Sequence, residues 1–84
     1  MERAEIEKRI RATVKEVLKV REDQITPQSR FRDDLGAESL DIVTLLLALE
    51  NEFKKPITDE EAKTLTTVGA VVDFIESQMA ADRK

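Results

Sequence analysis

Residues 33–53 read DDLGAESLDIVTLLLALENEF, and this stretch decides the fold. Gly36 can turn the chain, and Ser39 then precedes a nearly uninterrupted run of helix formers. The pattern predicts a helix that has Ser39 as its N-cap and ends at Phe53. In that position the serine oxygen accepts from a free amide of the first turn, and the neighbouring carboxylates complement the helix dipole. A purely structural role for the serine is therefore available from the start.

The predicted helix carries more apolar residues than one stripe can absorb. The stripe that recurs at helical spacing and forms a core face comprises Ile42, Leu45, Leu46, Leu49 and Phe53. A second stripe comprises Leu40, Val43 and Leu47. A chain of 84 residues has little interior to cover both stripes, so we expect the second one to be an exposed partner surface. The charged residues of this helix are all acidic, which favours basic partners.

Composition excludes several functional classes. The formal net charge is −4, and residues 25–53 hold two basic against six acidic residues, so nucleic acid is not an expected partner. The absence of cysteine and histidine excludes disulfides, Cys/His zinc sites and nucleophiles activated by histidine. No apolar run approaches the roughly 20 residues of a membrane span, and the first residues lack a signal-peptide layout. We expect a cytoplasmic protein.

The remaining chain predicts an all-α domain over residues 1–84. Helices are expected over about 2–20, from a Thr58 capping box to about 64, and from a cap at Thr66 or Thr67 to a frayed tail at about 80–84. Residues 21–38 form a polar connection pinned to the core by Ile25, Phe31 and Leu35. Acid-then-base pairs join Glu5 to Arg9 and Glu7 to Arg11. The prediction is a small four-helix bundle, with three longer helices, one short helix and a long loop between the first two.

Three segments of the sequence resemble the motifs of a known family. They are Asp34-Leu35-Gly36-Ala37-Glu38-Ser39-Leu40-Asp41, Leu49-Glu50-Asn51-Glu52-Phe53 and Ile57-Thr58-Asp59-Glu60-Glu61-Ala62. Over nearly its whole length the chain resembles the acyl carrier proteins of type II fatty-acid and polyketide synthesis. The resemblance implies that Ser39 carries 4′-phosphopantetheine derived from coenzyme A, whose thiol holds acyl groups as thioesters. Glu38 stands where the family usually has aspartate, and Thr44 and Asn51 replace commonly acidic residues, which indicates a specialised carrier.

The resemblance also implies two sets of site residues. A docking surface for a phosphopantetheinyl transferase and for acyl synthases and transferases of lipid or polyketide synthesis comprises Glu38, Leu40, Asp41, Val43, Leu47 and Glu50. A core that shelters the acyl chain comprises Leu45, Leu46, Leu49, Phe53, Ile57, Leu65, Val71, Val72 and Ile75. The implied protein is a monomer that performs no chemistry itself.

Other hypotheses remain open on the residues alone. A carrier of aminoacyl or peptidyl groups has a similar sequence, although the acidic central helix favours the acyl type. An unmodified helical adaptor would use the Leu40, Val43 and Leu47 stripe, with Ser39 only as a cap. The carboxylates Asp33, Asp34, Glu38 and Asp41 do not match EF-hand spacing, so we expect no metal site. With no cleft and no base-activated nucleophile indicated, an enzyme is not expected.

Overall fold

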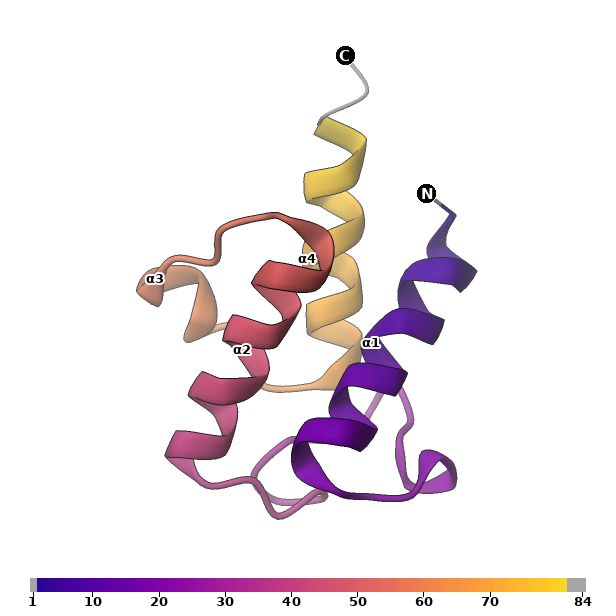
Figure 1. Cartoon of the computed structure of the whole chain (residues 1–84), viewed down its shortest axis with the longest axis vertical. Helices are drawn as coiled ribbons and strands as arrows, with labels where there is room; N and C mark the ends of the chain where they lie inside the picture. The colour runs from indigo at the N-terminus through magenta and orange to yellow at the C-terminus, as the bar shows by residue number, and fades with distance from the viewer. Residues whose placement is uncertain (1, 82–84) are drawn as a thin grey trace.

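A computed structural model describes residues 2–81 of the chain (Figure 1). Its elements are α1 (Arg3–Leu18), a short 3₁₀ helix η1 (Glu22–Gln24), α2 (Ser39–Phe53), α3 (Asp59–Ala62) and α4 (Val68–Ala81). Within the described part, extended pairing is limited to an isolated antiparallel bridge between Arg30 and Thr67. The predicted all-α bundle with a long first loop is confirmed. No helix in residues 2–81 has both the length and the apolar character needed to cross a bilayer.

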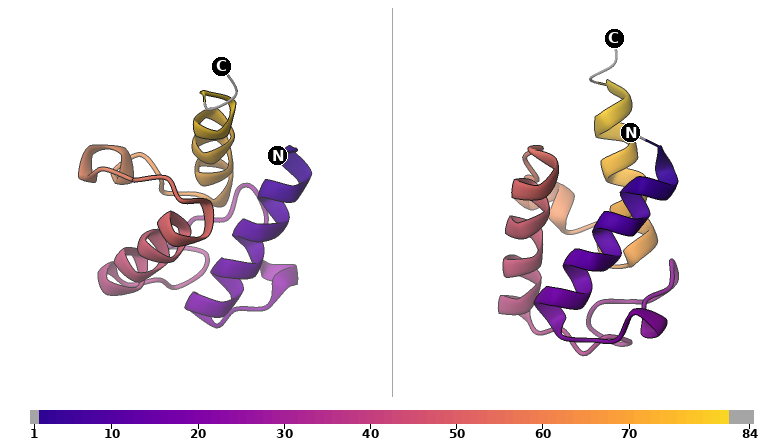
Figure 2. Two further views of the ribbon diagram at one scale, coloured as in Figure 1. Left: turned by 45° about the horizontal axis from the view of Figure 1, so that its top comes forward. Right: turned by 45° about the vertical axis from the view of Figure 1, so that its right-hand side comes forward.

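The helix α1 is the centre of the packing. Both α2 and α4 pack closely against it, whereas the backbones of α2 and α4 approach each other less closely. α1 runs opposite to the other two long helices, so α1 begins and α4 ends at the same end of the molecule (Figures 1 and 2). α2 begins at the other end, next to the long loop.

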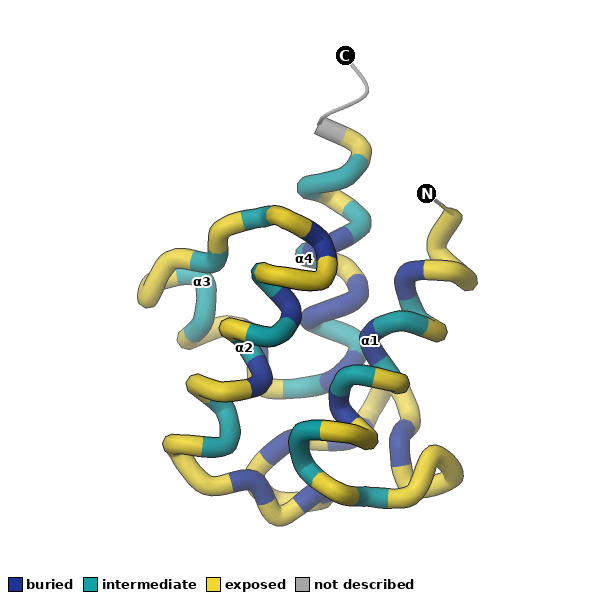
Figure 3. Tube along the Cα trace, in the orientation of Figure 1, coloured by how far each residue is buried: buried dark blue, intermediate teal, exposed yellow. Residues whose placement is uncertain are grey.

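The core follows the predicted apolar periodicity. The fully buried side chains of α1 are Ile6, Ile10 and Val14, and those of α2 and α4 are Leu45, Leu49, Val71 and Ile75. The buried positions recur at helical spacing along α1, α2 and α4 (Figure 3), so the buried residues of each of these helices share one face. Ile25, Phe31 and Leu35 of the loop are also buried, which confirms their predicted pinning role.

The long loop closes the beginning of α4. The Val68 amide donates to the Ser29 carbonyl (3.1 Å), and the Gly69 amide donates to the Pro27 carbonyl (2.9 Å). The Ala70 amide donates to Thr67 Oγ1 (3.1 Å), which confirms Thr67 as the cap. These bonds satisfy amides that the first turn of a helix leaves without intrahelical acceptors.

A buried serine stabilises the same loop. The Ser29 hydroxyl donates to the Gln24 carbonyl (3.0 Å) and accepts from the Thr26 amide (2.9 Å). Ser29 is only 5% exposed, so these bonds replace water for a side chain that has little access to it. The loop is therefore an ordered part of the bundle, held by its own hydrogen bonds and by the start of α4.

Several boundaries differ from the predicted ones. α1 ends at Leu18 because Lys19 adopts the left-handed conformation (φ 57°). The Thr58 capping box is confirmed, with a bond of 3.2 Å from the Glu61 amide to Thr58 Oγ1, but α3 ends at Ala62 and a turn then brings Leu65 into the core. α4 is helical through Ala81, and residues 82–84 lie outside the described part of the chain, so the expected fraying of residues 80–84 stays a prediction.

Two local features were not predicted or were predicted differently. Polar residues 22–24 form η1, a single turn too short to produce a periodic apolar pattern. Glu7 pairs with Arg3 (3.3 Å) instead of Arg11, while the predicted pair of Glu5 and Arg9 is present at 3.4 Å. Arg3 lies one turn before Glu7, so both arrangements satisfy the helical spacing and the sequence alone does not choose between them.

Candidate functional site

The start of α2 is built by a fixed turn. The Ala37 amide donates to the Phe31 carbonyl (2.8 Å), and Leu35 and Ala37 are both buried. Between them Gly36 adopts φ +69°, a left-handed conformation that glycine accepts without strain. The turn delivers Glu38 and Ser39 to the surface, where both are exposed.

Ser39 is the first residue of the helix and is not its N-cap, so that prediction was wrong. The N-cap is Glu38, which has extended backbone angles (φ −94°, ψ 172°). The physical reason is the neighbouring Asp41, whose Oδ2 accepts from the Glu38 amide (3.0 Å) and fixes the extended residue one position earlier. The serine hydroxyl is therefore not used to hold the helix end.

The hydroxyl has a different partner, which the sequence did not indicate. Arg32 Nη2 in the loop donates to Ser39 Oγ at 3.1 Å. Arg30, two residues earlier, instead forms ion pairs with Asp33 (3.3 Å) and Asp34 (3.6 Å). Loop residues 30–38 thus place charges of both signs before the start of α2, and the guanidinium of Arg32 is hydrogen-bonded to the serine oxygen.

Arg32 was missed because its contact depends on the path of the loop. Seven residues separate it from Ser39, a spacing that follows neither helical nor strand periodicity. The available signal was that Arg32 is one of only two basic residues in the acidic segment 25–53. That signal indicates a positive charge in this segment, but it does not indicate that the Arg32 side chain is directed toward Ser39.

The second apolar stripe of α2 is exposed as predicted. Leu40 is 74% exposed, Val43 52% and Leu47 56%. Glu38 is exposed at the same end of the helix, and Asp41 is half-buried. Glu50 has a structural contact, because its Oε2 accepts from the Ile57 amide (2.8 Å) and so holds the connection that follows α2.

The residues predicted to shelter an acyl chain lie together in the bundle. Seven are buried, namely Leu45, Leu49, Phe53, Leu65, Val71, Val72 and Ile75. Leu46 and Ile57 are half-buried and pack against that core. All of these residues come from α2, from α4 and from the connection between these two helices, and together they form one part of the core.

A cavity of about 300 Å³ lies beside the start of α2. Phe31, Ile42, Ala62 and Leu65 give it an apolar lining. Arg30, Arg32, Asp33 and Lys63 add charge to its walls. Leu65 thus belongs both to the predicted acyl-sheltering set and to this cavity, whereas the contribution of Phe31 and Ile42 was not predicted. The cavity connects the loop with α2 and with the end of α3.

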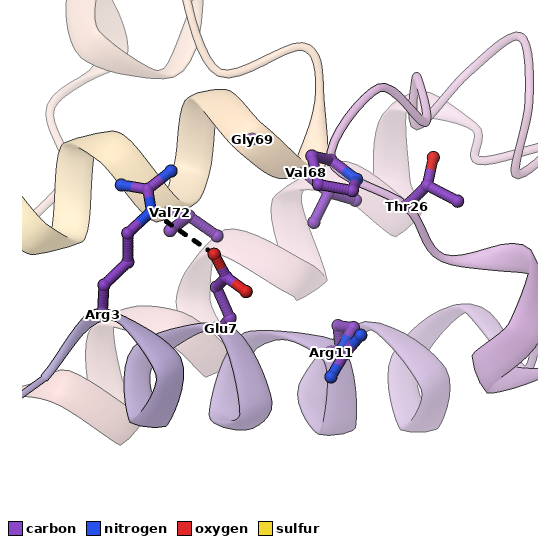
Figure 4. Close-up of a pocket in the computed structure, with 8 residues that line it drawn as sticks. Arg3, Glu7, Arg11, Thr26, Val68, Gly69 and Val72 are labelled. Carbon is purple, nitrogen blue, oxygen red and sulfur yellow. Dashed lines mark ion pairs between the residues drawn. The ribbon is translucent and has the colours of Figure 1, made fainter.

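A smaller cavity of about 30 Å³ lies between α1, the loop and the first turn of α4 (Figure 4). Arg3 and Glu7 form an ion pair at its edge, and hydrogen bonds to Asp73 and Glu76 raise the pKa of Arg3 above its ordinary value. Arg11 Nε is buried there without a hydrogen-bond partner within the described chain. A space of this size accommodates about one water molecule, so it is not a substrate site.

Residues 2–81 contain no group of three or more acidic side chains placed to hold a metal ion. The start of α2 offers a different chemistry, that of an exposed hydroxyl beside a guanidinium. An exposed hydroxyl is open to modification, and a guanidinium 3.1 Å away can donate hydrogen bonds to phosphate oxygens. The residues present therefore fit a phosphodiester attached at this point.

A comparison with protein families agrees with that chemistry. A family model described as "phosphopantetheine attachment site" matches residues 8–75. The match covers most of α1, the whole loop, α2 and α3, and the first half of α4. Members of this family are carriers that hold 4′-phosphopantetheine covalently and are not themselves enzymes. The chain belongs to the phosphopantetheine attachment-site family, and it is a carrier protein.

Proposed function

We propose that Ser39 is the attachment residue and that the chain is an acyl carrier protein of fatty-acid, polyketide or related lipid synthesis. The observation that carries the proposal is the exposure of Ser39 compared with the other serines. The chain contains Ser29, Ser39 and Ser77, and Ser77 lies outside the matched residues 8–75. Ser29 is buried and hydrogen-bonded on both sides. Ser39 alone is a serine that is both matched and exposed.

The loading step is a transfer from coenzyme A. The Ser39 oxygen gains the phosphopantetheine phosphorus, the pyrophosphate bond of coenzyme A breaks, and 3′,5′-adenosine diphosphate leaves while a base of the transferase removes the hydroxyl proton. The bound group supplies a terminal thiol that holds an acyl group as a thioester. The chain has no cysteine of its own, so this is the only thiol on the loaded protein.

The exposed stripe of α2 is suited to dock the partner enzymes. Leu40, Val43 and Leu47 supply apolar contact area next to the attachment point. Glu38 and Asp41 supply negative charge that steers partners with basic patches. Glu50 lies at the far margin of this surface and contributes less, because one of its oxygens is engaged by the Ile57 amide. A phosphopantetheinyl transferase and acyl synthases or transferases are the proposed partners.

The apolar interior is suited to shelter an acyl chain. The proposed shelter comprises Leu45, Leu46, Leu49, Phe53, Ile57, Leu65, Val71, Val72 and Ile75. Its weakest seam is the one between α2 and α4, because both helices pack more closely on α1 than on each other. The cavity beside the start of α2 reaches this interior through Leu65. We propose a monomer, since a single copy contains the attachment point, the docking stripe and the shelter. The proposed location is the cytoplasm.

Intact-mass measurement tests the attachment. The protein is incubated with coenzyme A and a broad-specificity phosphopantetheinyl transferase, beside the Ser39→Ala and Ser77→Ala variants. We expect a gain of one phosphopantetheine on the wild type and on Ser77→Ala, and none on Ser39→Ala. A gain that persists in Ser39→Ala contradicts the assignment. Where the wild type gains nothing, the Glu38→Asp variant tests whether the longer side chain demands a dedicated transferase.

Substitution within the docking stripe tests the partner surface. Leu47→Ala removes exposed apolar area, so we expect the KM of the carrier in the transferase reaction to rise by about tenfold, the effect of losing an interface residue worth about 1.4 kcal/mol. Ser77→Ala, an exposed substitution on α4 outside this surface, is the control and should leave KM unchanged. Equal values for the two variants place docking elsewhere.

The two alternative functions are an aminoacyl or peptidyl carrier and an unmodified adaptor. The first is distinguished by the group that it carries, and the second by partner binding that does not require Ser39. An aminoacyl carrier accepts the aminoacyl group of an adenylate from an adenylating enzyme, with AMP leaving, whereas the proposed acyl carrier accepts acyl groups from acyltransferases. The acidic α2 favours the latter. An unmodified adaptor gains no mass and binds its partner equally well with Ser39 or Ala at this position.

A further inference from the structure

Two arginines of the same loop have different partners. Arg30 is neutralised by Asp33 and Asp34, with N–O distances of 3.3 and 3.6 Å. Arg32 instead directs a guanidinium nitrogen to the neutral hydroxyl of Ser39 at 3.1 Å. A guanidinium bonds a charged oxygen more strongly than a neutral one, so this partner leaves most of the capacity of Arg32 unused.

A phosphodiester on Ser39 supplies the missing partner. Its non-bridging oxygens lie one bond beyond the phosphorus that is attached to Oγ, the atom that Arg32 already reaches. A guanidinium presents its N–H groups as a rigid fork that matches two such oxygens. The contact therefore forms with only a small displacement of the exposed Arg32 side chain.

The other charges nearby make this contact important for the attached group. Glu38 and Asp41 flank Ser39 and repel a phosphodiester. Asp41 is held in place by the Glu38 amide, so its carboxylate does not move away freely. Arg32 is the cation that offsets this repulsion, and it also lines the cavity formed with Ile42, Ala62 and Leu65.

We infer that Arg32 is a positioning residue that binds the phosphodiester of the group on Ser39 and directs that group toward this cavity. The inference rests on Ser39 being the attachment residue. It gives the loaded carrier a preferred resting arrangement, in which the arm lies along the loop side of α2 and leaves the Leu40, Val43 and Leu47 stripe uncovered for partners. A partner with its own cationic groups can then replace Arg32 and release the arm.

Phosphorus NMR of the loaded protein tests the contact without any enzymatic activity. Wild type, Arg32→Gln, Arg32→Lys and the control Arg30→Gln are loaded to completion, as verified by intact mass. We expect the ³¹P resonance to shift in Arg32→Gln, to shift less in Arg32→Lys and to stay unchanged in Arg30→Gln. Raising the salt from about 10 mM to 1 M shortens the Debye length from about 30 Å to about 3 Å, so the wild-type resonance should move toward that of Arg32→Gln.

A second measurement needs no substitution. The Nε–Hε signal of Arg32 is compared in the unloaded and loaded wild type, with that of Arg30 as the internal control. We expect loading to shift the Arg32 signal and to leave the Arg30 signal in place. This comparison remains available even where Arg32→Gln is not accepted by the transferase.

A spin label on the arm thiol tests the direction of the arm. The thiol is unique because the chain has no cysteine. We expect the label to broaden the backbone amide signals of Ala62 and Lys63 in the wild type, and at least half of that broadening to be lost in Arg32→Gln. Equal broadening in the two proteins contradicts the directing role.

The outcomes separate this inference from the proposed function. A chain that gains no mass even as the Glu38→Asp variant, or a gain of mass that persists in Ser39→Ala, overturns both. A correctly loaded wild type whose phosphorus resonance is the same as in Arg32→Gln, and whose Arg32 signal does not respond to loading, overturns the role of Arg32 alone. A shift specific to Arg32 supports it.

Discussion

The same loop lies beside the starts of α2 and α4, but it forms hydrogen bonds with the first backbone amides of α4 only. At α4, carbonyls of Pro27 and Ser29 and the hydroxyl of Thr67 accept from the first free amides. At α2, no loop carbonyl within residues 2–81 accepts from the amide of Ser39 or Leu40. The loop closes the start of α4 by hydrogen bonds, whereas the start of α2 is held by its own Glu38 and Asp41.

The difference shows how a small bundle keeps one hydroxyl exposed without losing order. The loop is fixed through Phe31, Leu35 and its bonds to α4, so the exposed start of α2 rests on a rigid support. Because the helix end is held by Glu38 and Asp41, the Ser39 hydroxyl is not needed for stability. Stability and chemistry are thereby assigned to different residues, and substitutions at the two helix starts should separate them.

The largest expected effect comes from the closed start. A Cβ at position 69 lies 2.8 Å from the Pro27 carbonyl oxygen, closer than van der Waals contact allows. Gly69→Ala should therefore destabilise the protein by about 1 to 3 kcal/mol, as measured by urea unfolding. Ser77→Ala, an exposed substitution on the same helix, is the control and should change stability by less than about 0.5 kcal/mol. An equally stable Gly69→Ala would show that the loop moves away from α4 at no cost.

The turn that precedes the start of α2 should give the next effect. Gly36 has φ +69°, and an added Cβ meets no atom within 4 Å. The cost of Gly36→Ala is therefore conformational only, about 1 to 2 kcal/mol. Gly36→Asn should cost less, because asparagine tolerates the left-handed region better than alanine does. Equal losses for the two variants would point to a contact rather than to the backbone angle.

Removing the cap of α4 should cost about 1 kcal/mol. Thr67→Ala deletes the hydroxyl that accepts from the Ala70 amide at 3.1 Å. Thr66→Ala is the matched control, since its backbone carbonyl, which accepts from Phe31, is retained. Thermal and urea unfolding should agree on the difference between the two variants.

The smallest effect on stability is expected at Ser39, where we expect the loss of loading to be complete. Ser39→Ala should change the unfolding free energy by less than about 0.5 kcal/mol, because the hydroxyl does not cap α2. A loss near 1 kcal/mol, equal to that of Thr67→Ala, would mean that Ser39 caps the helix in solution after all. The paired measurement therefore tests the corrected position of the cap directly.

Much of this architecture followed from the sequence because it depends on local periodicity. The two stripes of α2 are distinguished by spacing alone, and their burial agrees with it, with Leu45 and Leu49 inside and Leu40 and Leu47 outside. The capping box at Thr58 was identified for the same reason, since both of its partners lie within one turn.

The features that were missed depend on contacts between segments. The carbonyls of Pro27 and Ser29 reach α4 across some forty residues of chain, and nothing in the sequence around Val68 indicates them. The contact of Arg32 with Ser39 depends on the turn at Gly36, and the sequence does not indicate which residues that turn brings together. The misplaced cap is a smaller error, in which Ser39 and Glu38 compete for adjacent positions and Asp41 decides.

The direction of the helices has a practical consequence for joining this protein to something else. α1 begins and α4 ends at the end of the molecule away from the start of α2 (Figure 1). When the protein is coupled at the end where α1 begins and α4 ends, to a sensor surface, a bead or a fused polypeptide, Ser39 at the start of α2 faces away from the attachment. The protein is suited to capture its partners from solution while immobilised, with no redesign of its surface.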